Sequence, residues 1–170
     1  YEEMLNKGIG LSGESKDFFI EGRLSDLCSL LPKNFTPENI LDFGCGTGEH
    51  SLILSKKGHF CRGIDLSEDM INLASNKSKL NSKLELEFLV GDIKSYKSDL
   101  KFDIALMMFS VVGYLRSNKE LVSAFLNIRG NLKKGGLLIF DYWNGNSVLS
   151  SPPKQNFKTF SKDEFEVIRM

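Results

Sequence analysis

A glycine-rich segment and a distant acidic residue form the part of this sequence that could bind a ligand. The run Asp42-Phe43-Gly44-Cys45-Gly46-Thr47-Gly48 follows a short apolar stretch that is predicted to be a strand. Because glycine has no Cβ and tolerates positive φ, such a turn lets a ligand lie against bare backbone. The helix that is predicted next presents unpaired N–H groups at its start, which favour a polar or anionic group there.

Asp65 supplies the second half of this pattern. It ends the next predicted strand, 21 residues after Gly44, within Gly63-Ile64-Asp65-Leu66-Ser67. An acid at about this spacing in a Rossmann-type unit accepts hydrogen bonds from a ribose. The two segments together predict a nucleoside-containing ligand across the carboxyl end of a parallel sheet.

The glycine spacing favours one class of nucleoside. Dinucleotide-binding turns usually read G-x-G-x-x-G, whereas this turn reads G-x-G-x-G with Asp42 two residues before its first glycine. This pattern resembles motif I of the class I S-adenosylmethionine-dependent methyltransferases. The resemblance implies that S-adenosylmethionine is the cofactor and S-adenosylhomocysteine the product, and the spacing disfavours an NAD-dependent enzyme.

The resemblance also implies a set of residues along the cofactor. In that family a basic residue on the leading helix, here Arg23, meets the methionine carboxylate, and an apolar residue, here Met70, lies on the adenine. An aspartate after strand three, here Asp92, meets the adenine amino group. The alternatives are a solvated arginine, a core methionine and a turn aspartate. The complete set of expected cofactor residues is Arg23, Asp42, Gly44, Cys45, Gly46, Gly48, Asp65, Leu66, Met70, Asp92, Ile93 and Phe109.

The acceptor site is predicted from the segments after the fourth and fifth strands. Tyr142, Trp143 and Asn144 follow the fifth predicted strand, where open α/β sheets bind ligands, and are expected to line the acceptor pocket. A protonated amine has no lone pair to attack with, so a general base would help. Tyr114 and Asp141 are the candidates for that catalytic role, and Asp141 could instead only hold an ammonium group in place.

The stretches 108–115 and 141–145 resemble a methyltransferase subgroup that includes the sugar N,N-dimethyltransferases acting on nucleotide-linked aminosugars. This resemblance implies a small-molecule acceptor, with an amine or a nucleotide-linked aminosugar as the best single candidate. The alternatives are a small-molecule O-methyltransferase and a non-catalytic S-adenosylmethionine-binding module. Nucleic acid is not expected as a partner, because the sequence lacks a basic stripe and the asparagine-proline-proline-aromatic motif after strand four.

Helical and extended patterns alternate along the chain, which predicts an α/β fold. We expect a leading helix at about 14–31 and a core at about 39–142. The resemblance implies a Rossmann-like doubly wound sheet with the parallel strand order 3-2-1-4-5. The expected strands are 39–43, 60–64, 84–90, 102–108 and 137–140, and the expected core helices are 49–57, one that starts after Ser67, and 118–132.

Composition excludes several other classes of protein. The 170 residues include 22 basic and 22 acidic side chains, so no net charge draws the chain to nucleic acid or an anionic membrane. Three cysteines and the lack of a long apolar run predict a reduced, cytoplasmic protein with no membrane partner.

Cys45 is expected to pack under the turn, and His50 and His59 are each more typical of structural than of catalytic histidines. No metal site is expected.

The C-terminal segment predicts that residues 1–170 form a single, truncated methyltransferase domain. The family's sheet ends in an antiparallel hairpin beyond strand five, and we expect this hairpin to be missing. The segments 157–160 and 165–168 are predicted to be short strands of a lid. Strand five would then have an unpaired edge.

Overall fold

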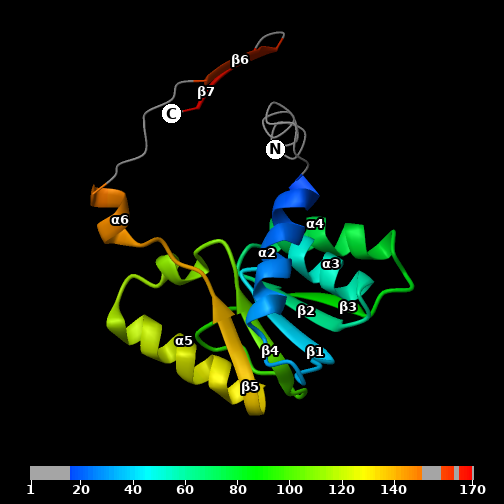
Figure 1. Cartoon of the computed structure of the whole chain (residues 1–170). Coiled ribbons are helices and arrows are strands. Elements are labelled where there is room, and N and C mark those ends of the chain that lie inside the picture. Colours follow the sequence, from blue (N-terminus) through cyan, green and yellow to red (C-terminus); the bar gives the residue numbers. More distant parts are fainter. Residues whose placement is uncertain (1–15, 151–157, 163–164, 170) are drawn as a thin grey trace.

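The computed structural model describes residues 16–150, 158–162 and 165–169. The predicted start of the leading helix at residue 14 lies outside these ranges. Figure 1 shows the elements in chain order, which are α2 (Lys16–Leu30), β1 (Asn39–Phe43), α3 (Glu49–Lys56), β2 (Phe60–Asp65), α4 (Glu68–Lys79), β3 (Leu86–Val90), β4 (Phe102–Met107), the 3-10 helix η1 (Val111–Tyr114), α5 (Asn118–Asn131), β5 (Leu132–Phe140), α6 (Gly145–Ser150), β6 (Lys158–Lys162) and β7 (Phe165–Arg169).

The strands β1 to β5 form one parallel sheet in the order β3-β2-β1-β4-β5, which confirms the predicted fold class. Successive strands step outward from β1 to β3, and the chain then crosses back to β4 on the other side of β1. The carboxyl ends of β1 and β4 therefore meet at the switch point, where open α/β sheets bind their ligands.

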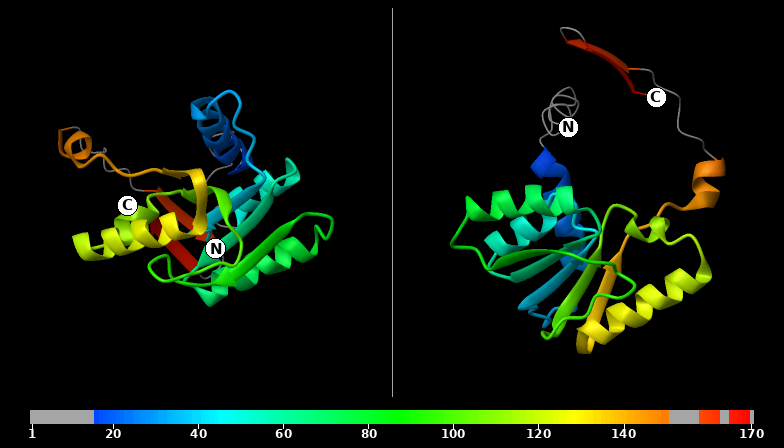
Figure 2. Two further views of the ribbon diagram at one scale, coloured as in Figure 1. Left: turned by 90° about the horizontal axis from the view of Figure 1, so that it is seen from below. Right: turned by 180° about the vertical axis from the view of Figure 1, so that it is seen from behind.

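Alternate residues of the central strands pack against two different layers, because successive side chains of a strand point to opposite faces. Ile40 of β1 belongs to one apolar cluster, with residues of α2 and α3, and Leu41 belongs to the other, with α5 and the 93–100 segment. Figures 1 and 2 show α5 beside β5 and well separated from α2 and α3. The central strands β1 and β4 are thus buried on both faces, as expected for a doubly wound fold, whereas the edge strands β3 and β5 are more exposed.

Strand β5 begins five residues earlier than the sequence pattern predicts. The sequence predicts a helix to residue 132 and a strand from residue 137, but the segment between them, Lys133-Lys134-Gly135-Gly136, lies within β5. Phe102 pairs with Leu132, whereas Ile104 pairs with Leu137, so the intervening residues bulge out of register, with Gly135 at a φ of 82°. This boundary prediction was wrong because a glycine with positive φ serves a bulge as well as a helix end.

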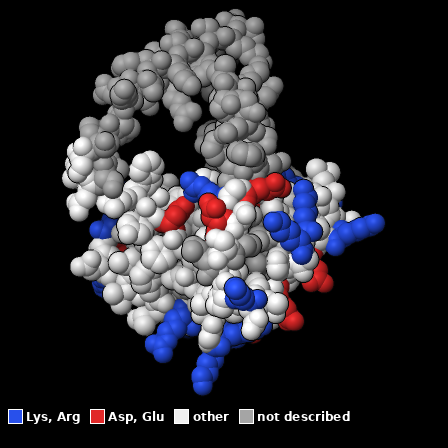
Figure 3. All heavy atoms as spheres, viewed as in Figure 1, with Lys and Arg blue, Asp and Glu red and all other residues white. Residues whose placement is uncertain are grey.

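Strands β6 and β7 form a separate antiparallel pair. The sequence predicts a short strand in each of these two segments but not their pairing, and residue 157 of the first segment lies outside the described ranges. No strand in the described ranges pairs with the outer edge of β5. The lid role and the assignment of residues 1–170 as one truncated domain stay predictions. Among the helices described here, none has the length and apolarity that a membrane crossing requires. Acidic and basic side chains are interspersed on the face shown in Figure 3.

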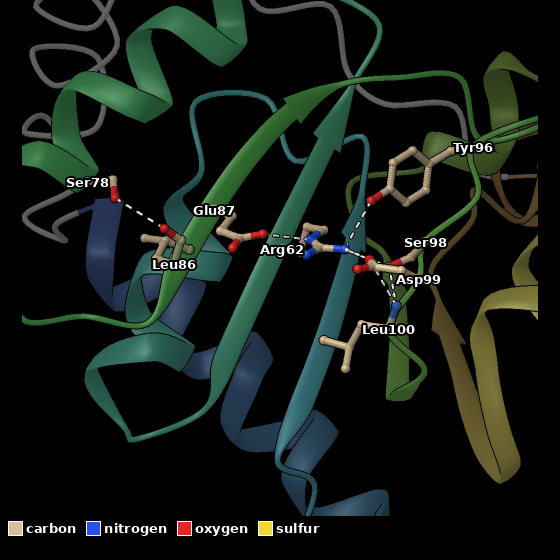
Figure 4. Close-up of polar contacts among 8 residues, drawn as sticks. All are labelled: Arg62, Ser78, Leu86, Glu87, Tyr96, Ser98, Asp99 and Leu100. Atoms are coloured by element: carbon tan, nitrogen blue, oxygen red, sulfur yellow. Dashed lines mark hydrogen bonds and ion pairs between the residues drawn. The ribbon is translucent and has the colours of Figure 1, made fainter.

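Arg62 of β2 forms hydrogen bonds with β3 and with the segment that connects β3 to β4, as Figure 4 shows. Its side chain is only 12% exposed. Nε donates to Glu87 Oε2 at 2.8 Å, and Nη1 donates to Ser98 Oγ at 2.6 Å and to the Tyr96 hydroxyl at 3.4 Å. The Ser98 amide in turn donates to Asn131 Oδ1 of α5 at 2.9 Å. These bonds order a helix-free connection that covers part of one sheet face.

We expect Arg62→Met to lower the free energy of unfolding by about 1–3 kcal/mol, because it removes charge-assisted hydrogen bonds from the 92–101 link. Urea denaturation of the purified variants measures this loss. Arg129→Met, at an exposed position of α5, is the matched control and should change the same free energy by less than about 0.5 kcal/mol. Equal losses in the two variants would contradict the role assigned to Arg62.

Candidate functional site

The turn between β1 and α3 adopts left-handed backbone at three glycines. Gly44, Gly46 and Gly48 have φ values of 70°, 53° and 80°. A Cβ at Gly44 would overlap Val111, and one at Gly48 would overlap Phe88, so these two glycines allow close packing. Nothing lies within 4 Å of the position that a Cβ would take at Gly46. Gly46 therefore leaves open space against bare backbone, which a ligand could fill.

Asp65 lies directly beside this turn, as the spacing predicts. The Gly46 amide donates to Asp65 Oδ2 at 2.9 Å, and the Ser67 amide donates to Oδ1 at 2.9 Å. Each carboxylate oxygen can accept more than one hydrogen bond, so these contacts leave acceptor capacity for a ribose. The ribose role stays a prediction, and the structure adds a second role in holding the turn.

Asp42 lies beneath the turn and not on its open side. It is 1% exposed, and its Oδ2 accepts a hydrogen bond from Ser51 Oγ of α3 at 2.7 Å. Burial raises the pKa of the Asp42 carboxyl to about 7, with a smaller contribution from the nearby Asp65, although the Ser51 bond acts in the opposite direction. This position favours support of the turn over direct contact with a cofactor.

Cys45 also packs under the turn, as expected. It is buried, and a Cβ at Gly63 would come within 2.8 Å of its Sγ. Burial, with further contributions from Asp42 and Asp65, raises the pKa of the Cys45 thiol far above its usual range. A protonated, enclosed thiol is a poor nucleophile, which agrees with a packing role.

The predicted adenine residues lie at the carboxyl ends of β2 and β3. The Gly91 amide donates to the Asp65 carbonyl at 2.9 Å and joins these two ends. Asp92 Oδ1 accepts from the Lys94 amide at 2.8 Å, which is a turn contact, and this leaves both the turn and the ligand interpretations open. Met70 is half-buried at the start of α4, Leu66 is exposed and Ile93 packs against the apolar cluster around Phe43.

Asp141, after β5, gathers three donors from two other segments. Its Oδ2 accepts from Arg23 Nη1 at 2.8 Å and from the Phe109 amide at 3.1 Å, and its Oδ1 accepts from the Ser110 amide. The guanidinium carbon of Arg23 lies 4.5 Å from the centre of the Phe109 ring. A carboxylate with these partners favours a role in positioning over that of a general base, and the catalytic assignment of Asp141 stays a prediction.

The remaining predicted residues are exposed. Tyr142 and Trp143 follow β5, and Asn144 Oδ1 accepts a hydrogen bond from the Asn146 amide at 3.1 Å. Tyr114 ends the 3-10 helix after β4 and is 78% exposed. The structure does not join Tyr114 to Asp141 by a hydrogen bond, so it does not assemble a preformed catalytic pair.

His50 is expected from the sequence to be structural, and the pattern places it in neither the cofactor site nor the acceptor site. It lies in the first turn of α3, is 4% exposed, and its ring centre lies 5.1 Å from that of Phe109. Burial, and secondarily the charge of Arg23, lower the pKa of its imidazole to about 4. The sequence feature that could have identified His50 is its position two residues after the last glycine of the turn.

No group of three potential metal-ligating side chains lies together in the part of the chain that the structure describes.

We expect the stability advantage of Asp42→Asn over the parent to grow as the pH rises from about 4 to about 7. The folded parent binds a proton at Asp42 more tightly than the unfolded chain, so its stability falls through this range, whereas asparagine does not titrate. The difference in unfolding free energy should change by about 2–4 kcal/mol.

Urea denaturation at several pH values measures this difference. The lowered pKa of His50 acts oppositely, because that contribution to stability is lost as the pH falls from about 6.5 to about 4. This effect is common to both chains and cancels in the comparison. Asp26→Asn, at an exposed position of α2, is the control. A difference that does not vary with pH would contradict the assignment for Asp42.

Comparisons with known proteins identify the family of this chain. The family model described as "Methyltransferase domain" matches residues 40–136, which is more than half of the chain. A dTDP-3-amino-3,4,6-trideoxy-alpha-D-glucopyranose N,N-dimethyltransferase from Streptomyces venezuelae is 32% identical over 133 residues, covering 77% of this chain and 53% of the relative. The putative methyltransferase YqeM from Bacillus subtilis (strain 168) is 32% identical over 125 residues, covering 73% of this chain and 50% of the relative.

The fold is similar to that of solved methyltransferases. The crystal structure of an S-adenosylmethionine-dependent methyltransferase from Clostridium acetobutylicum ATCC 824 has a TM-score of 0.71 and 25% identity, covering 96% of this chain and 64% of that one. The chain spans about half the length of the curated relatives that it matches. With its G-x-G-x-G turn, its acid at the end of β2 and its sheet order, this chain belongs to the class I S-adenosylmethionine-dependent methyltransferases.

Proposed function

We propose that this protein transfers the methyl group of S-adenosylmethionine to a small molecule, and that an amine or a nucleotide-linked aminosugar is the acceptor. The observation that carries the proposal is the open backbone at Gly46 beside the Asp65 carboxylate. The absence of a side chain at Gly46 leaves room for a nucleoside, because a Cβ at this position would fill the space that the ligand needs.

In this proposal, different residues contact different parts of the cofactor. The turn 44–48 lies under it, Asp65 accepts hydrogen bonds from the ribose, and Asp92, Ile93, Leu66 and Met70 surround the adenine. S-adenosylmethionine supplies a methyl group that its sulfonium has already activated. The protein therefore has mainly to align the acceptor and exclude water, and such positioning can contribute roughly 7–11 kcal/mol.

The acceptor is proposed from the residues that follow β4 and β5. Tyr114, Tyr142 and Trp143 present exposed aromatic surface after these strands. Aromatic faces attract cations, by about 0.5–2 kcal/mol, which suits an amine acceptor as well as a sulfonium. The aminosugar N,N-dimethyltransferase at 32% identity supports the same choice.

Tyr114 is the better-placed candidate for a general base. Asp141 is held by Arg23 and two backbone amides, so we assign it to holding the segment after β4, and through that segment the acceptor. An O-methyltransferase and a non-catalytic binding module are the alternatives. The exposed aromatic side chains favour an enzyme over the binding module, because a protein that only binds the cofactor needs no acceptor pocket.

We expect Gly46→Ala to weaken S-adenosylmethionine binding by tenfold or more, because its methyl group would enter the space proposed for the ligand. Gly58→Ala is the matched control, since Gly58 also has positive φ, at 95°, and nothing within 4 Å of its Cβ position, but lies at the end of α3. Both variants should lose about 1 kcal/mol of stability through backbone strain.

Titration calorimetry with S-adenosylmethionine, S-adenosylhomocysteine and NAD measures this effect. The parent and Gly58→Ala should bind the first two ligands with similar affinity and should not bind NAD. Similar binding by Gly46→Ala and Gly58→Ala would exclude the assigned cofactor position. Tight binding of NAD alone would show that NAD, and not S-adenosylmethionine, is the cofactor.

We expect methyl transfer from labelled S-adenosylmethionine to amines, with aminosugar nucleotides the best substrates of a panel that also contains phenols and carboxylates. Tyr114→Phe should lower kcat by about 10²-fold or more and leave cofactor affinity unchanged, because it removes only the proposed base. Tyr96→Phe, which alters a tyrosine in the Arg62 network, is the control and should keep its kcat. Transfer to phenols or carboxylates alone would favour the O-methyltransferase.

A further inference from the structure

A short polar network joins the segment after β3 to the start of α5. Lys94 Nζ lies 3.5 Å from Asp92 Oδ2 and 3.3 Å from Glu120 Oε1, so one ammonium group lies between two carboxylates from different segments. Glu120 Oε2 accepts the amide of Arg116 at 3.0 Å and the hydroxyl of Ser117 at 3.3 Å. We call the first three residues the Asp92–Lys94–Glu120 network.

On one side, the network holds the backbone that carries the proposed base. The 3-10 helix η1 ends at Tyr114, and the chain continues through Arg116 into α5. Asp141 accepts the two amides just before η1, and Glu120 accepts the amide of Arg116 just after it. Hydrogen bonds within a 3-10 turn have poorer geometry than those of an α-helix, so contacts at its ends contribute much of its order. A carboxylate therefore fixes each end of the segment that positions Tyr114.

On the other side, the network reaches the residue proposed to meet the adenine. Asp92 Oδ1 accepts the Lys94 amide at 2.8 Å, and Oδ2 is the oxygen beside the ammonium. The three side chains of the network are 30% to 36% exposed, so the flexible stem of Lys94 has room to move. The Asn127 side chain of α5 donates to the Ile93 carbonyl at 2.8 Å, which keeps the segment beside the helix.

We propose that Lys94 is a positioning residue that couples the adenine site at Asp92 to the segment 109–117, through Glu120. An amino group of the ligand that donates to Asp92 Oδ2 replaces part of the ammonium's contact there. The ammonium then shifts towards Glu120 and fixes its carboxylate in the orientation that accepts the Arg116 amide. The inference rests on the proposed function and adds an order of binding to it, in which the cofactor orders the segment before the acceptor binds.

The effect of this network is local. Hydrogen bonding to Glu120, and next the charge of Asp92, raise the pKa of the Lys94 ammonium, so the group is charged at neutral pH. Exposed ion pairs contribute little to global stability, so unfolding measurements would not separate this coupling from other effects. Hydrogen exchange of the Arg116 amide separates them, because this amide donates directly to Glu120.

The experiment measures amide exchange by NMR in the ¹⁵N-labelled protein, with and without saturating S-adenosylhomocysteine. Lys94→Met removes the charge at similar length, and Lys94→Arg keeps it. Lys97→Met is the matched control, because Lys97 is an exposed lysine of the same segment. The Ser98 amide, which donates to Asn131 Oδ1, corrects for changes in overall stability. Calorimetry establishes that each variant is saturated with ligand.

We expect the ligand to slow exchange of the Arg116 amide by about two- to fivefold in the parent, the range that an exposed ion pair provides. Lys94→Met should still bind the ligand but lose this slowing. Lys94→Arg and Lys97→Met should keep it. Exchange of the Ser98 amide should respond to the ligand equally in all four proteins.

A second measurement needs no ligand. Asp92→Asn removes the charge that competes with Glu120 for the ammonium, so Lys94 should pair with Glu120 all the time. The Arg116 amide of this ligand-free variant should then exchange as slowly as in the ligand-bound parent. A network that only stabilises the fold would lose a contact instead, and this amide would exchange faster. Faster or unchanged exchange in Asp92→Asn would overturn the inference.

Equal slowing in Lys94→Met and the parent would also overturn the inference, as would loss of the slowing in Lys97→Met. Binding of S-adenosylhomocysteine to the parent would still support the proposed function in either case. If the parent does not bind this ligand at all, the proposed function fails and the inference fails with it.

Discussion

The end of β2 is the point on which the geometry of the site depends. The Asp65 carboxylate accepts the amides of Gly46 and Ser67, and the Asp65 carbonyl accepts the amide of Gly91. The preceding carbonyl, of Ile64, accepts the amides of Gly44 and Cys45. One strand end therefore fixes the glycine turn after β1, the start of α4 and the end of β3. Three left-handed glycines could adopt many other turns, and these hydrogen bonds select this one.

A second aspartate holds the backbone after β4 in a comparable way. Asp141, after β5, collects the amides of Phe109 and Ser110 after β4 and the side chain of Arg23 from α2. The difference lies in the backbone, because the segment that Asp65 holds uses glycine at its left-handed positions, whereas the segment that Asp141 holds has a phenylalanine and a serine there. Glycine adopts left-handed backbone without strain, whereas the phenylalanine and serine after β4 are strained in the same conformation.

Particular residues show which features of the structure the sequence pattern could predict. The acid and glycine spacing placed Asp65 beside Gly46 correctly, because a strand, a turn, a helix and a second strand of these lengths in a parallel sheet leave few alternatives. The same reasoning failed at Gly135, because a bulge and a helix end both use a left-handed glycine, and only the pairing of β5 with β4 separates them. No sequence pattern identified the structural role of Arg62, because that role depends on contacts with Glu87, Tyr96 and Ser98, which are 25 to 36 residues away in the sequence.

The sequence by itself determined the fold class, the sheet order implied by the family resemblance, and the motif that binds the family's cofactor. Local periodicity encodes the alternation of helices and strands, and the spacing of glycines and acids encodes the motif, whereas the sheet order came only from the family resemblance. Tertiary structure decided which side of the turn each acid faces, so that Asp42 is enclosed and Asp65 is half-exposed. It also decided that Asp141 is held by Arg23 and that His50 lies buried against Phe109. Burial and partners depend on segments that meet only when the chain folds, and no pattern of neighbours along the sequence specifies them.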